Sequence, residues 1–211
     1  GLVPDWLVRR GIRRLLRHRL QQESDRSGGA RLDVERFADE LRSSPIAIEA
    51  DSANEQHYEV PAAFYEQVLG PRLKYSCGYW PNSETELAES EDLMLDMTCR
   101  RAELEDGMDV LDLGCGWGSL SLWIAEHYPK CRITAVSNSN SQRQFIEARC
   151  QTFGLRNVQV RTCNIAELAL DQQFDRVISV EMFEHVRNYQ LLLSRIRSWL
   201  VDDGKLFVHI F

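Results

Sequence analysis

Three glycines stand at alternate positions, Gly114, Gly116 and Gly118, directly after the largely apolar residues 110–113. Glycine is needed where a backbone turns tightly or passes close to a ligand, because it carries no Cβ. The spacing G-x-G-x-G differs from the G-x-G-x-x-G of dinucleotide-binding turns. The pattern therefore indicates either a turn that binds another kind of ligand or a plain turn between a strand and a helix.

Two acids and a histidine form a second group, Glu181, Glu184 and His185, directly after residues 174–180, which are predicted to form a strand. A carboxylate beside a histidine can orient the imidazole and keep it basic, which suits general acid–base chemistry. If the segment is helical, the four-residue spacing places Glu181 and His185 on one face. The alternative is a solvated pair of glutamates beside a histidine that caps a helix.

The alternation of strand and helix patterns from residue 108 onward places both groups at one edge of a sheet. The patterns predict strands at 108–113, 132–137, 158–163, 174–180 and 205–211, and helices at 119–128, 141–153 and 189–200. Such alternation is typical of parallel β-α-β units in an α/β fold. Ligands in these sheets bind beyond the carboxyl ends of the strands, where the glycine turn is expected.

The chain divides into three expected parts: residues 1–30 as a basic amphipathic helix and linker, 31–105 as a mostly helical cap, and 106–211 as the α/β core. We expect residues 51–105 to be mostly helical, with a loop near 76–83. The first twenty residues hold six arginines and one aspartate around an apolar face. This helix would either lie on an anionic membrane surface or pack on protein with its arginines solvated.

Composition narrows the function classes. The net charge of −7 argues against a general nucleic-acid-binding protein. No apolar stretch approaches the ~20 residues of a membrane span. We expect no secretory signal and a cytoplasmic protein, peripheral to a membrane if the basic helix binds one. The six cysteines show no metal-binding or disulfide spacing, so no metal site is expected, and they suit a reducing cytosol.

Four separated motifs occur in order: residues 54–61 (Asn-Glu-Gln-His-Tyr-Glu-Val-Pro), 74–80 (Lys-Tyr-Ser-Cys-Gly-Tyr-Trp), the glycine turn, and 181–185 (Glu-Met-Phe-Glu-His). Together they resemble the cyclopropane-fatty-acid synthase superfamily of S-adenosylmethionine (SAM)-dependent methyltransferases, and within it the coclaurine N-methyltransferase-like amine N-methyltransferases. The resemblance covers about residues 50–211. It implies a Rossmann-like class I methyltransferase core under a helical cap. Such cores usually continue after the fifth strand, so we expect this sequence to be part of a longer protein.

The resemblance also implies a SAM site. Tyr75 and Ser76 would reach the amino-acid end of SAM from the cap, while Ile165 would pack on its adenine. Asn164 stands where an aspartate is usual, so it keeps an acceptor but loses a charge. Ordinary core packing is the alternative for Tyr75 and Ile165. The full set of expected cofactor residues is Tyr75, Ser76, Gly114, Gly116, Gly118, Ser137, Gln142, Asn164 and Ile165.

The resemblance assigns Glu181 and His185 as the catalytic pair, with Glu184 shaping the pocket. In the lipid enzymes of the superfamily, residues matching Cys77, Glu184 and His209 hold a bicarbonate ion, and all three are present. Glu181 stands where those enzymes usually have glycine, and its charge favours a cationic substrate.

The leading hypothesis is therefore SAM-dependent methylation of the nitrogen of a small-molecule amine. One alternative is a cyclopropane-fatty-acyl-phospholipid synthase or related lipid methyltransferase that uses bicarbonate. Another is a non-catalytic SAM-binding or interaction module.

Overall fold

The computed structural model describes residues 3–26, 30–48 and 61–211, and the chain forms two compact units, Gly1–Ser44 and Pro45–Phe211. The first unit contains α1 (Asp5–Arg26) and α2 (Ala30–Ser43). An ion pair of 2.6 Å joins Asp5 to Arg9 one turn along α1. This helix takes up most of the segment expected to form the basic helix and linker. None of the described helices is both long enough and apolar enough to cross a membrane.

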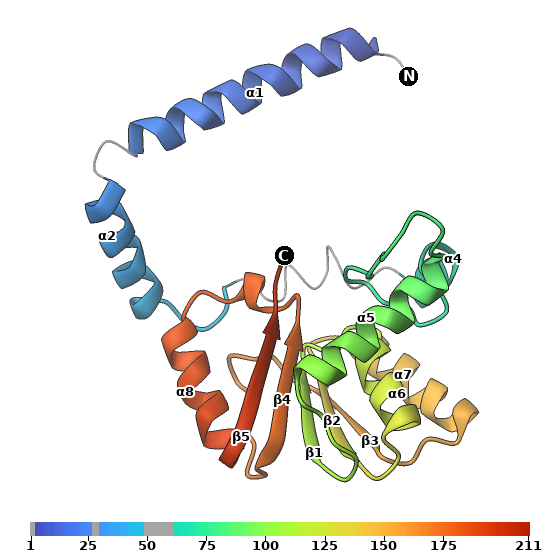
Figure 1. The fold of residues 1–211 in the computed structure, drawn as a ribbon. Helices are drawn as coiled ribbons and strands as arrows, with labels where there is room; N and C mark the ends of the chain where they lie inside the picture. The colour runs from blue at the N-terminus through green and yellow to red at the C-terminus, as the bar shows by residue number, and fades with distance from the viewer. Residues whose placement is uncertain (1–2, 27–29, 49–60) are drawn as a thin grey trace. The chain divides into compact units, whose positions relative to one another are not determined.

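A five-stranded parallel sheet forms the centre of the second unit, in the order β3-β2-β1-β4-β5 (Figure 1). The strands are β1 (Asp109–Leu113), β2 (Arg132–Ser137), β3 (Val158–Thr162), β4 (Phe174–Val180) and β5 (Leu200–His209). From β1 the chain builds outward through β2 to β3 and then returns to β4 on the other side. The order therefore reverses between β1 and β4, which is where parallel sheets bind ligands.

Helices cover both faces of this sheet, and α8 lies apart from α6 and α7 in Figure 1. The helices of the second unit are α4 (Ala62–Val68), α5 (Leu87–Arg101), α6 (Ser119–His127), α7 (Asn140–Phe153) and α8 (Tyr189–Trp199). Val110 packs with residues of α5 and α6, whereas Leu111 packs with residues of α8. Because β1 is buried on both faces, the neighbouring residues Val110 and Leu111 are both apolar, although their side chains point to opposite faces. The predicted α/β class is confirmed.

Two local predictions were wrong. The chain between α4 and α5 is non-helical from residue 69 to 86, a longer stretch than the predicted loop. Glu91 of α5 accepts hydrogen bonds from the backbone amides of Arg72 (2.9 Å) and Lys74 (3.1 Å), which removes both amides from any helix. The last strand begins at Leu200, not residue 205, and its pairing with β4 is irregular near Phe174. Residues 54–60 of the first motif lie outside the described part of the chain.

Candidate active site

The turn after β1 has all three of its glycines in the left-handed region, with φ of +90° at Gly114, +52° at Gly116 and +83° at Gly118. A Cβ at Gly114 would lie 2.7 Å from Met182 Cγ, and one at Gly118 would lie 2.6 Å from Ile146 Cγ1. A Cβ at Gly116 would meet no atom within 4 Å. Gly118 therefore allows α6 to pack against α7, whereas Gly116 faces open space.

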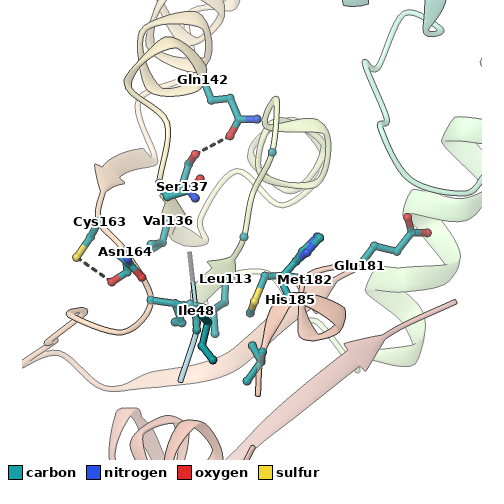
Figure 2. Close-up of a pocket in the computed structure, with 16 residues that line it drawn as sticks. Ile48, Leu113, Val136, Ser137, Gln142, Cys163, Asn164, Glu181, Met182 and His185 are labelled. Atoms are coloured by element: carbon teal, nitrogen blue, oxygen red, sulfur yellow. Dashed lines mark hydrogen bonds between the residues drawn. The ribbon is translucent and has the colours of Figure 1, made fainter. Parts of the chain in front are cut away.

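Two cavities of about 300 and 330 Å³ meet beside this turn, and Gly114, Gly116, Glu181 and His185 line both of them. The first lies beyond the ends of β2 and β3, and Figure 2 shows it. The second lies between the turn and the loop that precedes α5. Eight of the nine predicted cofactor residues line one cavity or the other. The exception is Gly118, which lines neither cavity and packs closely against Ile146 of α7.

The first cavity has a polar wall built by residues that follow β2. Ser137 Oγ donates to Gln142 Oε1 at 2.5 Å, and Ser139 Oγ accepts from Gln142 N at 3.3 Å, so the Gln142 side chain is fixed. Gln142 is buried, and its Nε2 has no hydrogen-bond partner in the described part of the chain. Buried polar groups nearly always have partners, so this donor is available for a ligand.

Asn164 and Ile165 lie across the same cavity, in the turn that follows β3. The side-chain oxygen of Asn164 accepts from Ala166 N at 3.0 Å, which fixes the amide at the cavity wall. One lone pair of this oxygen is therefore used within the turn, and the other remains for a ligand. Ile165 supplies an apolar surface beside it.

Glu181 does not lie in a helix, so the one-face arrangement with His185 that a helix would give does not apply. Glu181 has a positive φ of +49° and lies before a single 3-10 turn, η2 (Phe183–His185). Its N–H donates to His209 O at 2.8 Å, and its Oε1 accepts from Cys77 N at 2.9 Å. In Figure 2 the side chain extends away from the His185 ring, and no hydrogen bond joins these two described residues. The two groups therefore share the cavity walls without forming a bonded pair.

The expected bicarbonate trio is only partly assembled. Cys77 Sγ lies 3.6 Å from His209 Nε2, and a Glu181 oxygen, not one of Glu184, lies within 4.8 Å of both. Glu184 Oε1 instead accepts from Phe211 N at 3.0 Å. Partial burial and the Glu181 carboxylate raise the pKa of the Cys77 thiol, so the sulfur stays protonated at neutral pH.

Asp112 lines the second cavity and was missed by the sequence analysis because it lies within the apolar run of β1. It is 2% exposed, and its carboxylate accepts from Ser121 Oγ at 2.6 Å. Burial raises its pKa to about 6. A pKa raised above the unfolded value means that ionisation costs stability, and this cost appears as the pH rises from about 4 to 6.

Replacing Asp112 with asparagine should therefore raise the free energy of unfolding at pH 8 by about 3 kcal/mol, and the gain should shrink below pH 6. Urea unfolding at pH 8 and pH 5 measures this difference. Asp202→Asn, which changes an exposed carboxylate, is the control and should show no such pH dependence. A gain that is equal at both pH values would show that Asp112 is not a buried acid with a raised pKa.

Comparison with known proteins identifies the family of this chain. The family model for mycolic acid cyclopropane synthetase matches residues 47–211. The chain belongs to this family. It is 42% identical to (S)-coclaurine N-methyltransferase of Thalictrum flavum subsp. glaucum, over 99% of this chain and 58% of that enzyme. It is 33% identical to the cyclopropane-fatty-acyl-phospholipid synthase of Escherichia coli K12, over 73% of this chain and 39% of that enzyme.

Solved structures of family members have the same fold. A coclaurine N-methyltransferase bound to N-methylheliamine and SAH matches 99% of this chain with a TM-score of 0.86 and 40% identity, and 61% of that chain is covered. The mycolic acid cyclopropane synthase CmaA1 with SAH and CTAB matches 74% of this chain and 55% of its own, with a TM-score of 0.68 and 26% identity. The fold is thus that of class I SAM methyltransferases. The chain spans less than two thirds of the length of these relatives.

Proposed function

We propose that this family member is a SAM-dependent methyltransferase that methylates the nitrogen of a small-molecule amine. The observation that carries the proposal is the wall common to both cavities, where Gly116 lies with Glu181 and His185. A methyl donor that extends through both cavities must pass the side chains of Glu181 and His185. The relatives that are 38–42% identical over 99% of this chain are coclaurine N-methyltransferases, which supports an amine acceptor.

The residues of both cavities fit SAM. Gly116 has the free space that a close ligand needs, and Ile165 and Met182 offer apolar surface for an adenine ring. Gln142 Nε2 in the first cavity and Trp117 Nε1 in the second are buried donors without partners among the described residues. When bound, SAM supplies a methyl carbon activated by a positively charged sulfur. We assign the adenosine end to the first cavity and the methionine end to the second.

The chain's own residues would bind the amine and remove its proton. An aliphatic amine is largely protonated at pH 7 and must lose a proton before its lone pair can react. The Cys77 N–H holds Oε1 of Glu181, so the carboxylate is fixed at the wall of both cavities and attracts a cation. The His185 imidazole, on the same wall, can take the proton to solvent because it is exposed. Glu184 lines neither cavity and would shape the pocket only indirectly, by accepting from the backbone of Phe211, which lines the second cavity. Bicarbonate has no part in the proposal.

Two further expectations belong to the proposal. The six cysteines, all in the described part of the chain, are free thiols, which supports a cytosolic location. The arginines of α1 support contact with anionic membranes, which binding to anionic liposomes at low and high salt can measure.

Product analysis tests the proposed function directly. The full-length protein is incubated with methyl-labelled SAM and either a panel of secondary and tertiary amines, including benzylisoquinolines, or unsaturated phospholipid with bicarbonate. We expect mass spectrometry to find the label on an amine nitrogen. Label found only in the phospholipid would contradict the amine assignment, and SAM binding without transfer to either panel would favour a non-catalytic module.

A further inference from the structure

A lysine lies buried in the second cavity and has no part in the function described so far. Lys74 is 5% exposed and lines the cavity beside Tyr75 and Ser76. Lys74 is the first residue of the motif at residues 74–80, and the family resemblance implied no role for it. Lysine is almost never fully buried unless it is paired, so its position requires a physical reason.

The loop before α5 is built to hold this lysine in place. Glu91, which is 2% exposed, accepts hydrogen bonds from the backbone amides of Lys74 and Arg72. A Cβ on Gly70 would lie 2.3 Å from Glu91 Oε2, so the loop passes directly against the carboxylate. Leu73 has a positive φ of +52°, which turns the chain just before Lys74. The backbone of the lysine is thus fixed from two sides.

The charged end of Lys74 is incompletely paired. Its ammonium donates to Ser76 Oγ, a neutral acceptor, and no carboxylate in the described part of the chain lies within 4.0 Å of it. Burial lowers the pKa of Lys74, whereas the nearby acidic groups Cys77, Glu181 and Glu91 act in the opposite direction. Both oxygens of Glu91 already accept backbone hydrogens, and Glu181 Oε1 accepts from Cys77. An ammonium has three donors, so up to two remain for a ligand.

We propose that the buried ammonium of Lys74 is a positioning group in the second cavity, which holds the carboxylate at the methionine end of SAM beside Ser76. This inference rests on the proposed function. Of the groups that the reaction brings to the site, the amine and the sulfonium are cations and the adenine is neutral, whereas this carboxylate is an anion. Lys74 would therefore orient the donor and, by repulsion, keep the protonated amine out of the cofactor's end of the site.

A truncated ligand tests this assignment without an activity assay. Calorimetry on the full-length protein compares the binding of S-adenosylhomocysteine (SAH) with that of decarboxylated SAH, which lacks only the carboxylate. The wild type should bind SAH about 10- to 100-fold more tightly, as expected for a buried charge-assisted contact. Lys74→Met should lose most of this preference and bind decarboxylated SAH as the wild type does. Ser76→Ala should shift the preference in the same direction by a smaller factor.

Lys130→Met is the matched control, because it removes an exposed lysine that lines neither cavity. Equal SAH affinity in the wild type and Lys74→Met would overturn the inference and leave the proposed function standing. An equal loss for both ligands in Lys74→Met would give the lysine a structural role only. Absence of SAH binding to the wild type would instead remove the proposed function, and the inference with it. If Lys74→Met does not fold, Lys74→Gln and Ser76→Ala carry the same comparison.

Discussion

Replacing Glu181 by glycine should lower kcat/KM for the amine about 10²- to 10⁴-fold while leaving the protein at least as stable as the wild type. The loss follows from removal of the carboxylate that attracts the ammonium to the cavity wall, where His185 takes the proton. The preserved stability follows from the backbone, because Glu181 has a φ of +49°, a conformation that glycine adopts without strain. Relief of this strain is worth roughly 1 kcal/mol, which offsets the lost hydrogen bond to Cys77 N.

Glu103 provides a matched control for this experiment. It is also a glutamate with a positive φ, of +52°, but it is exposed and lines neither cavity. Glu103→Gly should relieve the same backbone strain, lose an exposed ion pair to Lys205, and leave kcat/KM unchanged. Steady-state kinetics and urea unfolding on both variants separate the chemistry from the backbone effect.

The pH dependence of kcat/KM distinguishes a role of Glu181 in proton removal from a role in amine binding alone. As the pH rises, the free amine loses its own proton, so the rate of Glu181→Gly should recover by up to about tenfold per pH unit until the amine is neutral. A Glu181→Gly variant with nearly wild-type kcat/KM at pH 7 would show that the carboxylate has no part in the reaction. A constant deficit at every pH would limit its role to binding.

Replacing Gly116 by alanine should weaken SAH binding about 10- to 100-fold, because the new methyl group would occupy space that the cofactor needs. Gly116 lines both cavities, and its Cβ position is open in the described structure. The same substitution places a non-glycine residue at a φ of +52°, at a cost of roughly 1 kcal/mol in the free energy of unfolding.

Gly154→Ala is the control, because Gly154 also has a positive φ, of +68°, and also has no atom within 4 Å of its Cβ position. It follows α7 and lines neither cavity. Both variants should lose similar stability in urea unfolding, and only Gly116→Ala should lose affinity in calorimetry. Equal SAH affinities in the two variants would mean that the ligand does not pass the glycine turn.

The sheet was predictable from the sequence because it depends on local patterns. The strands at the centre of a parallel sheet are largely apolar, and the residues that follow the strands must meet at one edge. Ser137, Gln142, Asn164 and Ile165 line one cavity for this reason, since they follow β2 and β3, and their contact with a cofactor stays a prediction. The packing role of Gly118 could not be predicted from the sequence, because it depends on Ile146, which is 28 residues away in a different helix.

The arrangement of the charged groups was not predictable, because tertiary contacts decide it. A pattern of acids and histidine after β4 suits a helix, yet the bond from Glu181 N to His209 O extends the pairing of β4 with β5 and leaves Glu181 in a left-handed turn. Similarly, the choice of Glu181 over Glu184 as the partner of Cys77 depends on this turn. Burial of Lys74 depends on Glu91, whose role appears only when the loop and α5 are seen together.

A crystal structure of the full-length protein with SAH and an N-methylated amine tests the central claim most directly. We expect SAH to extend from Gln142 in the first cavity past Gly116 to Lys74 in the second, with the amine nitrogen within hydrogen-bonding distance of Glu181 or His185. SAH bound outside these two cavities, or an amine nitrogen remote from both side chains, would contradict it.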